Sequence, residues 1–430
     1  MAYHAQRSPS KAHRWMRCPG SIVQERAHPE TGRSKYADEG TVAHHIAAEL
    51  LLGAEVNTHP GERWWIVRSD VTGEEMIRHD LRAQALLDSG NATALFEITL
   101  DADFTDAVYT YVDWVRGEVE ALSLVAESVE LLVEQAVPIG HLTGEKGATG
   151  TADAVIVYIQ NGVTHLHVID LKFGKGKKVS ANDNEQMQIY ALGVEEQISL
   201  TYTLTDESTV TMSIMQPRQD TEPRTITATY AEMQAFAEQV RQAAYEVDMA
   251  EATHAITGKV QADYIRPDPQ ACGWCRAKVE CLAEPVKRMV ETVDITELSP
   301  IDPIADYYAF AEVAETWIKG VRALVAEKLA KGEAVEGLKM VAGCEGHRAW
   351  KDEEAAKEAI IKAGYKPTVE EMRSPTDLEK EVKKKPLFKT LFDHLITRSP
   401  GKPKVVHASD PRPAIQLNTD ELSTIEDDEE

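Results

Sequence analysis

The chain has 430 residues, of which 43% are hydrophobic, so it can bury a large core and is long enough for more than one domain. Its formal net charge of −25 argues against DNA binding by the surface as a whole and restricts any nucleic-acid site to a local basic channel. The sequence shows neither a signal peptide nor a stretch of about 18 apolar residues, which predicts a cytoplasmic location and no membrane partner.

Helical and strand patterns alternate in the first part of the chain. Residues 41–53 (TVAHHIAAELLLG) have apolar side chains at helical spacing and end on a glycine, which predicts a helix with His44 on its first turn. Residues 106–124 indicate a second helix, and the following SVELLVEQAVPI has the alternation of a strand.

The clearest β pattern is a pair of β-branched runs, GATGTADAVIVYIQNG and VTHLHVIDLKFG. Asn161-Gly162 between them is the dipeptide that a two-residue turn favours, so the sequence predicts an antiparallel hairpin. A helix over NDNEQMQIYALGV, a strand over residues 210–217 and a long amphipathic helix over residues 231–250 are expected to follow.

The later part of the chain has a different character. YYAFAEVAETWIKGVRALVAEKLAKG predicts a helix, GLKMVAGCEGHRAW a short β element, and the residues up to about 397 charged helices. Residues 400–413 are a proline-rich connector, and the acidic DELSTIEDDEE at the end predicts a disordered tail.

The hairpin carries a set of residues suited to phosphodiester chemistry. Asp153 and Asp170 are expected to point to one side near the same end, with Lys172 on the face of Asp170. Carboxylates hold Mg²⁺ or Mn²⁺, and a nearby ammonium group steadies a water or the developing charge. Alone, the pattern also fits two strand-end acids and a solvated lysine.

A basic, glycine-rich loop follows this set directly. Lys175, Lys177 and Lys178 form a candidate local lip for DNA, and Gly174 and Gly176 would let the backbone approach a phosphate. A lysine loop that is merely solvated has the same pattern.

The five cysteines are unevenly placed. Cys272, Cys275 and Cys281 form a C-x₂-C-x₅-C run, Cys18 lies far upstream, and Cys344 is a spectator in the later segment. Four thiolates fit either tetrahedral zinc or an iron–sulfur cluster, and the spacing does not choose between them.

Four short motifs follow one another along the chain: Gly40-Thr-Val-Ala-His44, Gly150-Thr-Ala-Asp153, Asp170-Leu-Lys172 and Gln186-Met-Gln-Ile-Tyr190. Together they resemble the motifs of the RecB-like branch of the PD-(D/E)XK nuclease superfamily. The resemblance implies an α/β fold of the restriction-endonuclease-like type, with a mixed central sheet flanked by helices.

The same resemblance implies roles for the motif residues. The metal ligands would be His44, Asp153, Asp170 and the carbonyl of Leu171, and Lys172 would be the catalytic lysine. Gln186 and Tyr190 would support the site or touch the DNA strand. By position alone His45 competes with His44 and Gln188 with Gln186, and Tyr190 also fits a purely packing role.

The arrangement of one cysteine before and three after the nuclease motifs is similar to that of AddB-type subunits and CRISPR-associated RecB-like exonucleases. In those nucleases a 4Fe-4S cluster ties the two segments together, which implies a cluster on Cys18, Cys272, Cys275 and Cys281. The chain as a whole resembles a phage and prophage family that has no assigned substrate, which implies a phage- or prophage-encoded protein in a bacterial cell.

These observations predict five segments and one activity. The segments are an N-terminal piece with the first cysteine (1–38), a nuclease core (39–260), a cysteine arm (261–286), a mainly helical region (287–399) and the connector with its acidic tail (400–430). The expected activity is that of a Mg²⁺- or Mn²⁺-dependent exonuclease that acts on DNA ends or single strands in phage recombination or repair.

A single-strand annealing protein is a candidate partner for the nuclease. Three other functions also fit the same residues: a catalytically inactive DNA-binding module, a zinc-binding regulatory protein, and a phage protein that docks a partner.

Overall fold

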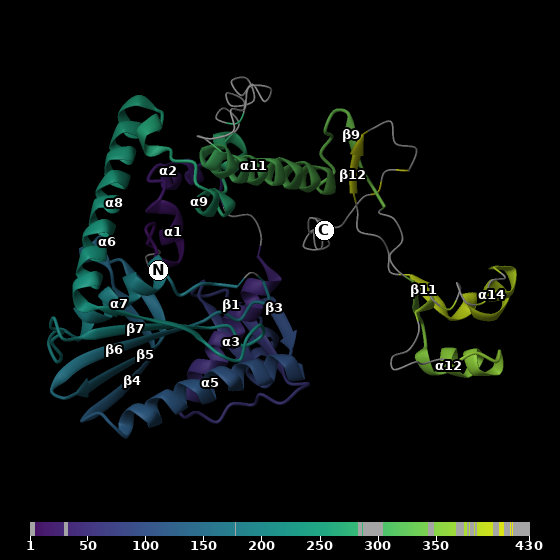
Figure 1. Cartoon of the computed structure of the whole chain (residues 1–430), viewed down its shortest axis with the longest axis horizontal. Helices are drawn as coiled ribbons and strands as arrows, with labels where there is room; N and C mark the ends of the chain where they lie inside the picture. Colours follow the sequence, from purple (N-terminus) through teal and green to yellow (C-terminus); the bar gives the residue numbers. More distant parts are fainter. Residues whose placement is uncertain are drawn as a thin grey trace. The chain divides into compact units, whose positions relative to one another are not determined.

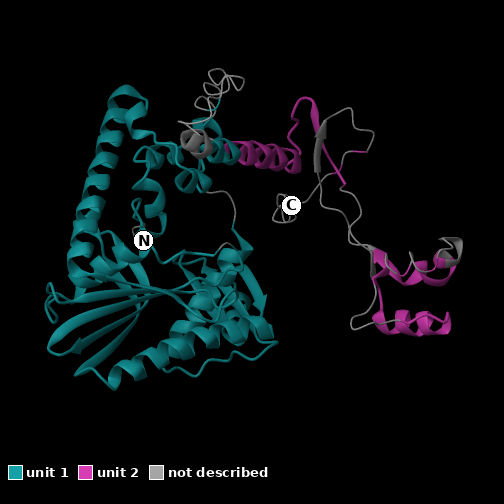
Figure 2. Cartoon of the chain, viewed as in Figure 1, with its two compact units in different colours: residues 1–316 teal, residues 317–430 magenta. Residues whose placement is uncertain are grey.

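The computed structural model describes residues 5–29, 33–176, 178–282, 286, 304–342, 348–366, 374–375, 378, 382, 385–398, 404–407, 413 and 415. The chain divides into two compact units, residues 1–316 and residues 317–430 (Figure 2). Among the helices of these described residues, none has the length and hydrophobicity that crossing a bilayer requires.

A five-stranded mixed sheet forms the centre of the first unit (Figure 1). Its order is β4-β5-β6-β7-β8, with β6 and β7 parallel and every other neighbouring pair antiparallel. The strands are β4 (Ser128–Pro138), β5 (Thr149–Gln160), β6 (Val163–Leu171), β7 (Thr209–Met215) and β8 (Arg224–Thr229). Helices cover both faces, so the expected α/β class with a mixed central sheet is confirmed.

The predicted hairpin is the pair β5 and β6. Asn161 and Gly162 both have the positive φ that the turn requires, 52° and 75°. The parallel partner β7 follows a crossover through α7 (Glu185–Ile198), and the edge strand β8 was not predicted.

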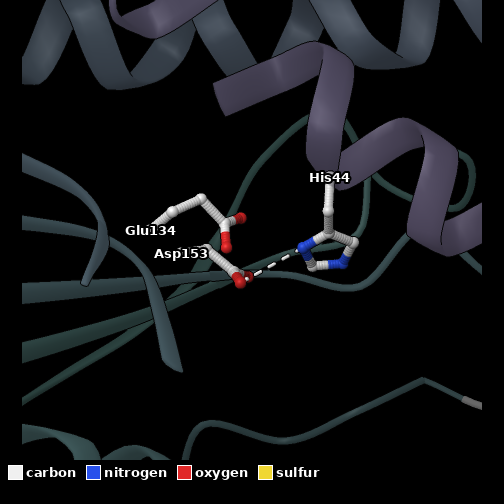
Figure 3. A group of neighbouring side chains, drawn as sticks. All are labelled: His44, Glu134 and Asp153. Carbon is white, nitrogen blue, oxygen red and sulfur yellow. Dashed lines mark hydrogen bonds and ion pairs between the residues drawn. The ribbon is translucent and has the colours of Figure 1, made fainter. Parts of the chain in front are cut away.

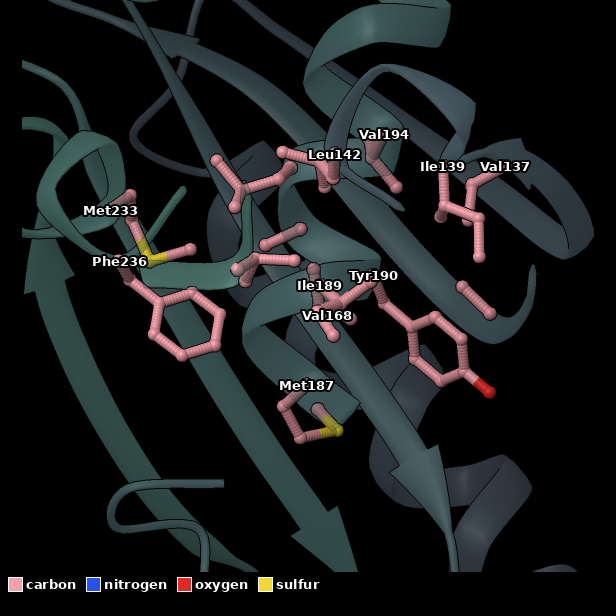
Figure 4. Packing of buried hydrophobic residues seen from close by; sticks show 14 of the residues in the cluster. Val137, Ile139, Leu142, Val168, Met187, Ile189, Tyr190, Val194, Met233 and Phe236 are labelled. Carbon is pink, nitrogen blue, oxygen red and sulfur yellow. The ribbon is translucent and has the colours of Figure 1, made fainter. Parts of the chain in front are cut away.

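One face of the sheet is covered by α7 and α8 (Tyr230–Thr257), whose apolar side chains interlock with those of the strands (Figure 4). Each helix has a side-chain cap: Asn184 accepts the amide of Met187 at 3.2 Å, and Thr229 with Glu232 forms a capping box on α8. The N-terminal segment also packs beside this face, through η1 (Pro9–Lys11), α1 (Ala12–Trp15) and α2 (Ser21–Arg26).

The opposite face is covered by α3 (Lys35–Leu51) and α5 (Ala102–Ser123). The helix predicted over 41–53 therefore begins earlier, and His44 lies well inside α3, so its expected place on the first turn was wrong. Asp38 stabilises this earlier start, because its carboxylate lies in the first turn and pairs with Arg33 at 2.6 Å.

A second, three-stranded sheet packs beside α3 and was not predicted. Its order is β2-β1-β3, and α4 precedes its last strand. The elements are β1 (Arg63–Ser69), β2 (Glu75–His79), α4 (Asp80–Asp88) and β3 (Ala92–Thr99). Three short elements also belong to this unit: α6 (Gly140–Thr143), η2 (Ala262–Tyr264) and α9 (Pro269–Gly273).

From residue 304 onward the described elements are a long helix and two small β pairs. They are α11 (Ile304–Ala330), β9 (Leu338–Val341), β10 (Arg348–Trp350), α12 (Glu353–Lys362), α14 (Lys385–Phe392), η4 (Asp393–Leu395), β11 (Ile396–Arg398) and β12 (Lys404–His407). The single β element expected over GLKMVAGCEGHRAW was wrong, because β9 pairs with β12 and β10 with β11 in two separate sheets. Cys344, the acidic tail and most of the proline-rich connector lie outside the described residues.

Candidate metal centre

Three side chains meet at one end of the central hairpin (Figure 3). His44 comes from α3, Glu134 from β4 and Asp153 from β5, and one ligand atom of each lies within 4.8 Å of the others. Nδ1 of His44 is 3.1 Å from Oδ1 of Asp153. Among the described residues this is the one group of three metal-ligating side chains with that spacing.

Glu134 was not predicted, and its backbone explains why it takes part. The register places it opposite Asp153, between the pairs Val133 with Ala154 and Gln135 with Ala152. Its φ of 47° is in the left-handed region, which a glutamate rarely adopts and which is frequent at functional sites.

This distortion breaks the alternation of β4. Leu132 and Val137 pack against the same core although they are five residues apart. In a regular strand these two side chains would point to opposite faces. In the sequence, Glu134 is only an acidic residue in the strand that precedes the hairpin. Glu130 in the same strand fits that description equally, so the sequence does not distinguish the two.

Lys172 is the centre of a second set of contacts next to this group. Its Nζ lies 2.9 Å from Oδ2 of Asp170 and 3.0 Å from Oε1 of Gln186. Nε2 of Gln186 donates to Oδ1 of Asp170 at 3.2 Å and to the hydroxyl of Tyr190 at 3.0 Å. Four residues of the predicted site are therefore joined in one network.

The two sets are linked through the backbone of β6. Asp153 Oδ2 accepts the amide of Leu171 at 2.7 Å, so the carboxylate is held between the imidazole and the strand that carries Asp170. Asp170 itself bonds toward α7 and lies outside the three-residue group with 4.8 Å spacing. The structure thus brings all the predicted side chains together, with Glu134 beside His44 and Asp170 beside Lys172.

The alternative residues have other partners. The ring of His45 packs edge-on against Trp64, at 6.0 Å between centroids, whereas His44 reaches Asp153. Gln188 donates to the carbonyl of Asn184 in its own helix, at 3.5 Å, whereas Gln186 joins Lys172 and Asp170. Geometry therefore favours His44 and Gln186.

The charges of the site perturb one another. Burial alone would lower the pKa of His44, but the charges of Asp153, Asp170 and Glu134 outweigh it and raise this pKa to about 9. Burial, with Asp153 nearby, raises the pKa of Glu134 to about 7, and burial also raises the pKa of Asp170. The pKa of Asp153 is lowered despite burial, because His44, the Leu171 amide and Lys172 favour its anion.

The donor set fits a hard divalent cation. Carboxylates are the ligands that Mg²⁺ and Mn²⁺ sites use, and the imidazole extends the set to a transition metal such as Mn²⁺. Oδ2 of Asp170 is buried and accepts no hydrogen bond from the described residues. It does form an ion pair with the ammonium group of Lys172, at 2.9 Å. A bound cation would satisfy such a partly paired carboxylate.

An open groove leads to this group. It has a volume of about 470 Å³ and is lined by α3, by Ile77 of β2 and by Thr151 of β5, with His44, Glu134 and Asp153 in its wall. The site is therefore accessible from solvent along one side of α3.

The basic lip has acidic partners. Lys175 pairs with Asp103 at 3.0 Å and Lys178 with Asp220 at 2.8 Å, while Lys177 lies outside the described residues. All four paired side chains are at least one-third exposed, so the ion pairs are weak and exchangeable.

The four predicted cysteines line one cavity. Cys18 follows α1, Cys272 lies on α9, and Cys275 and Cys281 follow closely after it. Two backbone amides point at the sulfurs, from Arg266 to Cys18 at 3.5 Å and from Asp268 to Cys272 at 3.4 Å. The topology thus joins the N-terminal segment and the downstream cysteine run.

The thiols are buried, and both basic and acidic side chains surround them. Burial raises the pKa of all four, to about 12 for Cys275 and to about 11 for Cys281. Arg14, Arg266 and Lys278 line the same cavity. Thiolates would form here only with a bound cation that compensates their charge.

The model of one protein family matches residues 4–413 of the chain, and its description is "Protein of unknown function (DUF2800)". The match covers both compact units, including the metal-ligating group and the thiol cavity.

Proposed function

Because the chain belongs to this family of unknown function, we propose its activity from the site itself: a divalent-metal-dependent nuclease that hydrolyses phosphodiester bonds in DNA. The observation that carries the proposal is the convergence of His44, Glu134 and Asp153 within 4.8 Å, next to the Lys172 network. The sequence resemblance to RecB-like PD-(D/E)XK nucleases and the mixed sheet support the same activity.

Each side chain has a task in this proposal. When bound, Mg²⁺ or Mn²⁺ supplies a Lewis acid that polarises a phosphate and lowers the pKa of a water. His44, Glu134 and Asp153 would hold the cation, and Asp170 with the carbonyl of Leu171 would extend the donor set toward β6. Lys172 stays protonated, because Asp170 outweighs the effect of burial and raises its pKa, so it places a fixed positive charge beside the reacting phosphate.

Gln186 and Tyr190 act on the lysine rather than on DNA. Gln186 accepts from the ammonium and donates to Asp170, which fixes the direction of the Lys172 side chain. Tyr190 in turn fixes Gln186. The groove beside α3 admits a strand of DNA, and we propose ends or single strands as substrates, in phage recombination or repair, where a single-strand annealing protein would supply or receive the strand.

The test is digestion of end-labelled linear and closed-circular DNA with Mn²⁺ by the full chain. Asp153→Ala and Lys172→Ala should each lower the rate by at least about 100-fold, because each removes a charge used in the transition state. Gln186→Ala should lower it less, and Gln188→Ala, on the same helix but outside the network, is the matched control. Cleavage retained by Asp153→Ala rejects the site, whereas DNA binding by wild type without cleavage identifies an inactive DNA-binding module.

We also propose that Cys18, Cys272, Cys275 and Cys281 hold a structural 4Fe-4S cluster. Tetrahedral zinc would bring its sulfurs to about 3.8 Å from one another, from a Zn–S bond of about 2.3 Å. Among the described residues, no three of these sulfurs lie within 4.8 Å of one another, so the chain does not present a preformed tetrahedral zinc site. Amide donors to sulfur and the ammonium group of Lys278 would compensate a cluster that is negatively charged overall, whereas Arg14 pairs with Glu25 and Arg266 with Glu246.

Metal analysis distinguishes the two occupants. Anaerobically purified protein should be brown and contain iron and acid-labile sulfide, and Cys275→Ala should lose both. Cys344→Ala is the matched control and should retain them. A colourless protein with one zinc would favour the zinc-binding alternative.

A further inference from the structure

Tyr111 on α5 has a buried hydroxyl with no use in the fold. The residue is 1% exposed, and its hydroxyl has no hydrogen-bond partner among the described residues. Leaving a hydroxyl unpaired in the interior is costly, and nearly all buried polar groups in native proteins are paired. The neighbours of Tyr111 along the buried stripe of α5, Phe104, Val108 and Val112, are apolar, so packing alone would favour a phenylalanine.

The hydroxyl lies beside the candidate metal centre. Tyr111 lines a narrow recess together with His44, Glu134, Asp153 and Leu171. Burial raises the pKa of Tyr111 well above its usual value, and the negative charges of Asp153, Asp170 and Glu134 add to that effect. Because Glu134 and Asp153 line the same recess, the Tyr111 side chain lies beside carboxylate acceptors.

We infer that Tyr111 is a positioning residue, whose hydroxyl donates a hydrogen bond to a carboxylate ligand of the metal centre when a divalent cation is bound. This inference rests on the proposed function, since it needs a cation at His44, Glu134 and Asp153. In the free protein, His44 and the Leu171 amide already engage Asp153. If His44 ligated a cation, its nitrogen would no longer be free to bond Asp153, and the carboxylates would need another donor to fix their orientation.

The same helix offers a matched control. Tyr109 is two residues away, and its hydroxyl is 2.9 Å from Oγ1 of Thr58, outside the recess. Tyr109→Phe removes a satisfied hydroxyl from α5, whereas Tyr111→Phe removes an unsatisfied one.

The experiment measures Mn²⁺ affinity from the free-Mn²⁺ EPR signal, and thermal unfolding in EDTA and in Mn²⁺, for both variants of the full chain. Tyr111→Phe should bind Mn²⁺ about 10- to 100-fold more weakly, the usual effect of losing a group that orients a ligand. In EDTA its melting temperature should equal or exceed that of wild type, because no hydrogen bond is lost. Tyr109→Phe should melt lower in EDTA and keep the wild-type Mn²⁺ affinity.

The outcomes separate the two claims. If wild type binds Mn²⁺ and Tyr111→Phe binds it within about twofold of wild type, the hydroxyl has no role at the metal, and only this inference fails. If wild type binds no Mn²⁺, the proposed function fails and this inference with it.

Discussion

The protonation of His44 gives a test of the metal centre that does not depend on DNA. His44 has a pKa of about 9 in the folded chain, mainly because the attraction of Asp153 exceeds the cost of burial, against about 6.5 in an unfolded chain. Because the folded pKa is raised, the stabilisation is complete below about pH 6.5 and is lost as the pH rises through 9. The difference between the two values corresponds to about 3 kcal/mol of unfolding free energy.

The perturbation is His44→Gln, which removes the titrating group from α3. Denaturant unfolding of both proteins in EDTA, from about pH 6 to about pH 9.5, gives the difference in unfolding free energy at each pH. This difference should shrink by about 3 kcal/mol across the range. Glu134 has a pKa of about 7 in the folded chain against an ordinary value of 4.5. Its contribution to the unfolding free energy is therefore lost between these two pH values, before most of the contribution of His44 is lost.

Saturating Mn²⁺ should reverse the pH dependence of the unfolding free energy that His44 causes in the wild type. A cation binds the neutral imidazole, so protons compete with it and the stabilisation by Mn²⁺ grows as the pH rises toward 9. His44→Gln should lose most of this growth. Parallel pH profiles of wild type and variant in EDTA would show that Asp153 and His44 are not coupled, and the assignment of the centre would then be wrong.

Two further substitutions test the surroundings of the site. Gly150→Ala should destabilise the first unit by about 1–3 kcal/mol in denaturant unfolding. A Cβ at this position would lie 2.8 Å from Cε1 of Tyr190 and 2.9 Å from Cγ of Pro9. An unchanged unfolding midpoint would contradict this packing. Replacing Lys175 and Lys178 together by alanine should change stability by less than about 1 kcal/mol, since both ion pairs are exposed. It should weaken DNA binding and lower the salt dependence of log K by about 0.7 to 0.9 per lost phosphate contact, and an unchanged salt slope would exclude these lysines from the DNA site.

The parts of the site that sequence could supply are those fixed by local chemistry. The Asn161-Gly162 turn sets the register of β5 against β6, and that register alone places Asp153 and Asp170 at the same end of the hairpin. Gln186 and Tyr190 follow from their spacing on one helix. In these cases the partner lies within a few positions or across one predictable turn.

The parts that sequence missed depend on long-range packing. Glu134 belongs to the site because it lies opposite Asp153 and its backbone has a positive φ of 47°. No residue pattern predicts that a glutamate in a strand will have a positive φ. Tyr111 looks like one more apolar member of an amphipathic helix until α5 is placed against the sheet. The β1–β3 sheet was missed because β3 pairs with β1 across β2 and α4, and because β2 and β3 have no fully buried residue, so their alternation is weak.

The negative charge of the chain and the proposed substrate can be reconciled through the pairing of the lysines. Lys175 and Lys178 are each held by an exposed carboxylate, Asp103 and Asp220, so the loop presents little net charge until a phosphate replaces those carboxylates. Each replacement exchanges one weak ion pair for another, which gives little affinity to duplex DNA at large. Under the proposed function, specific engagement would depend on the cation centre and on Lys172, whose side chain is less exposed than those of the loop lysines, so salt would screen it less. A strand end that reached the groove would gain these contacts, and DNA that only touched the outer surface would not.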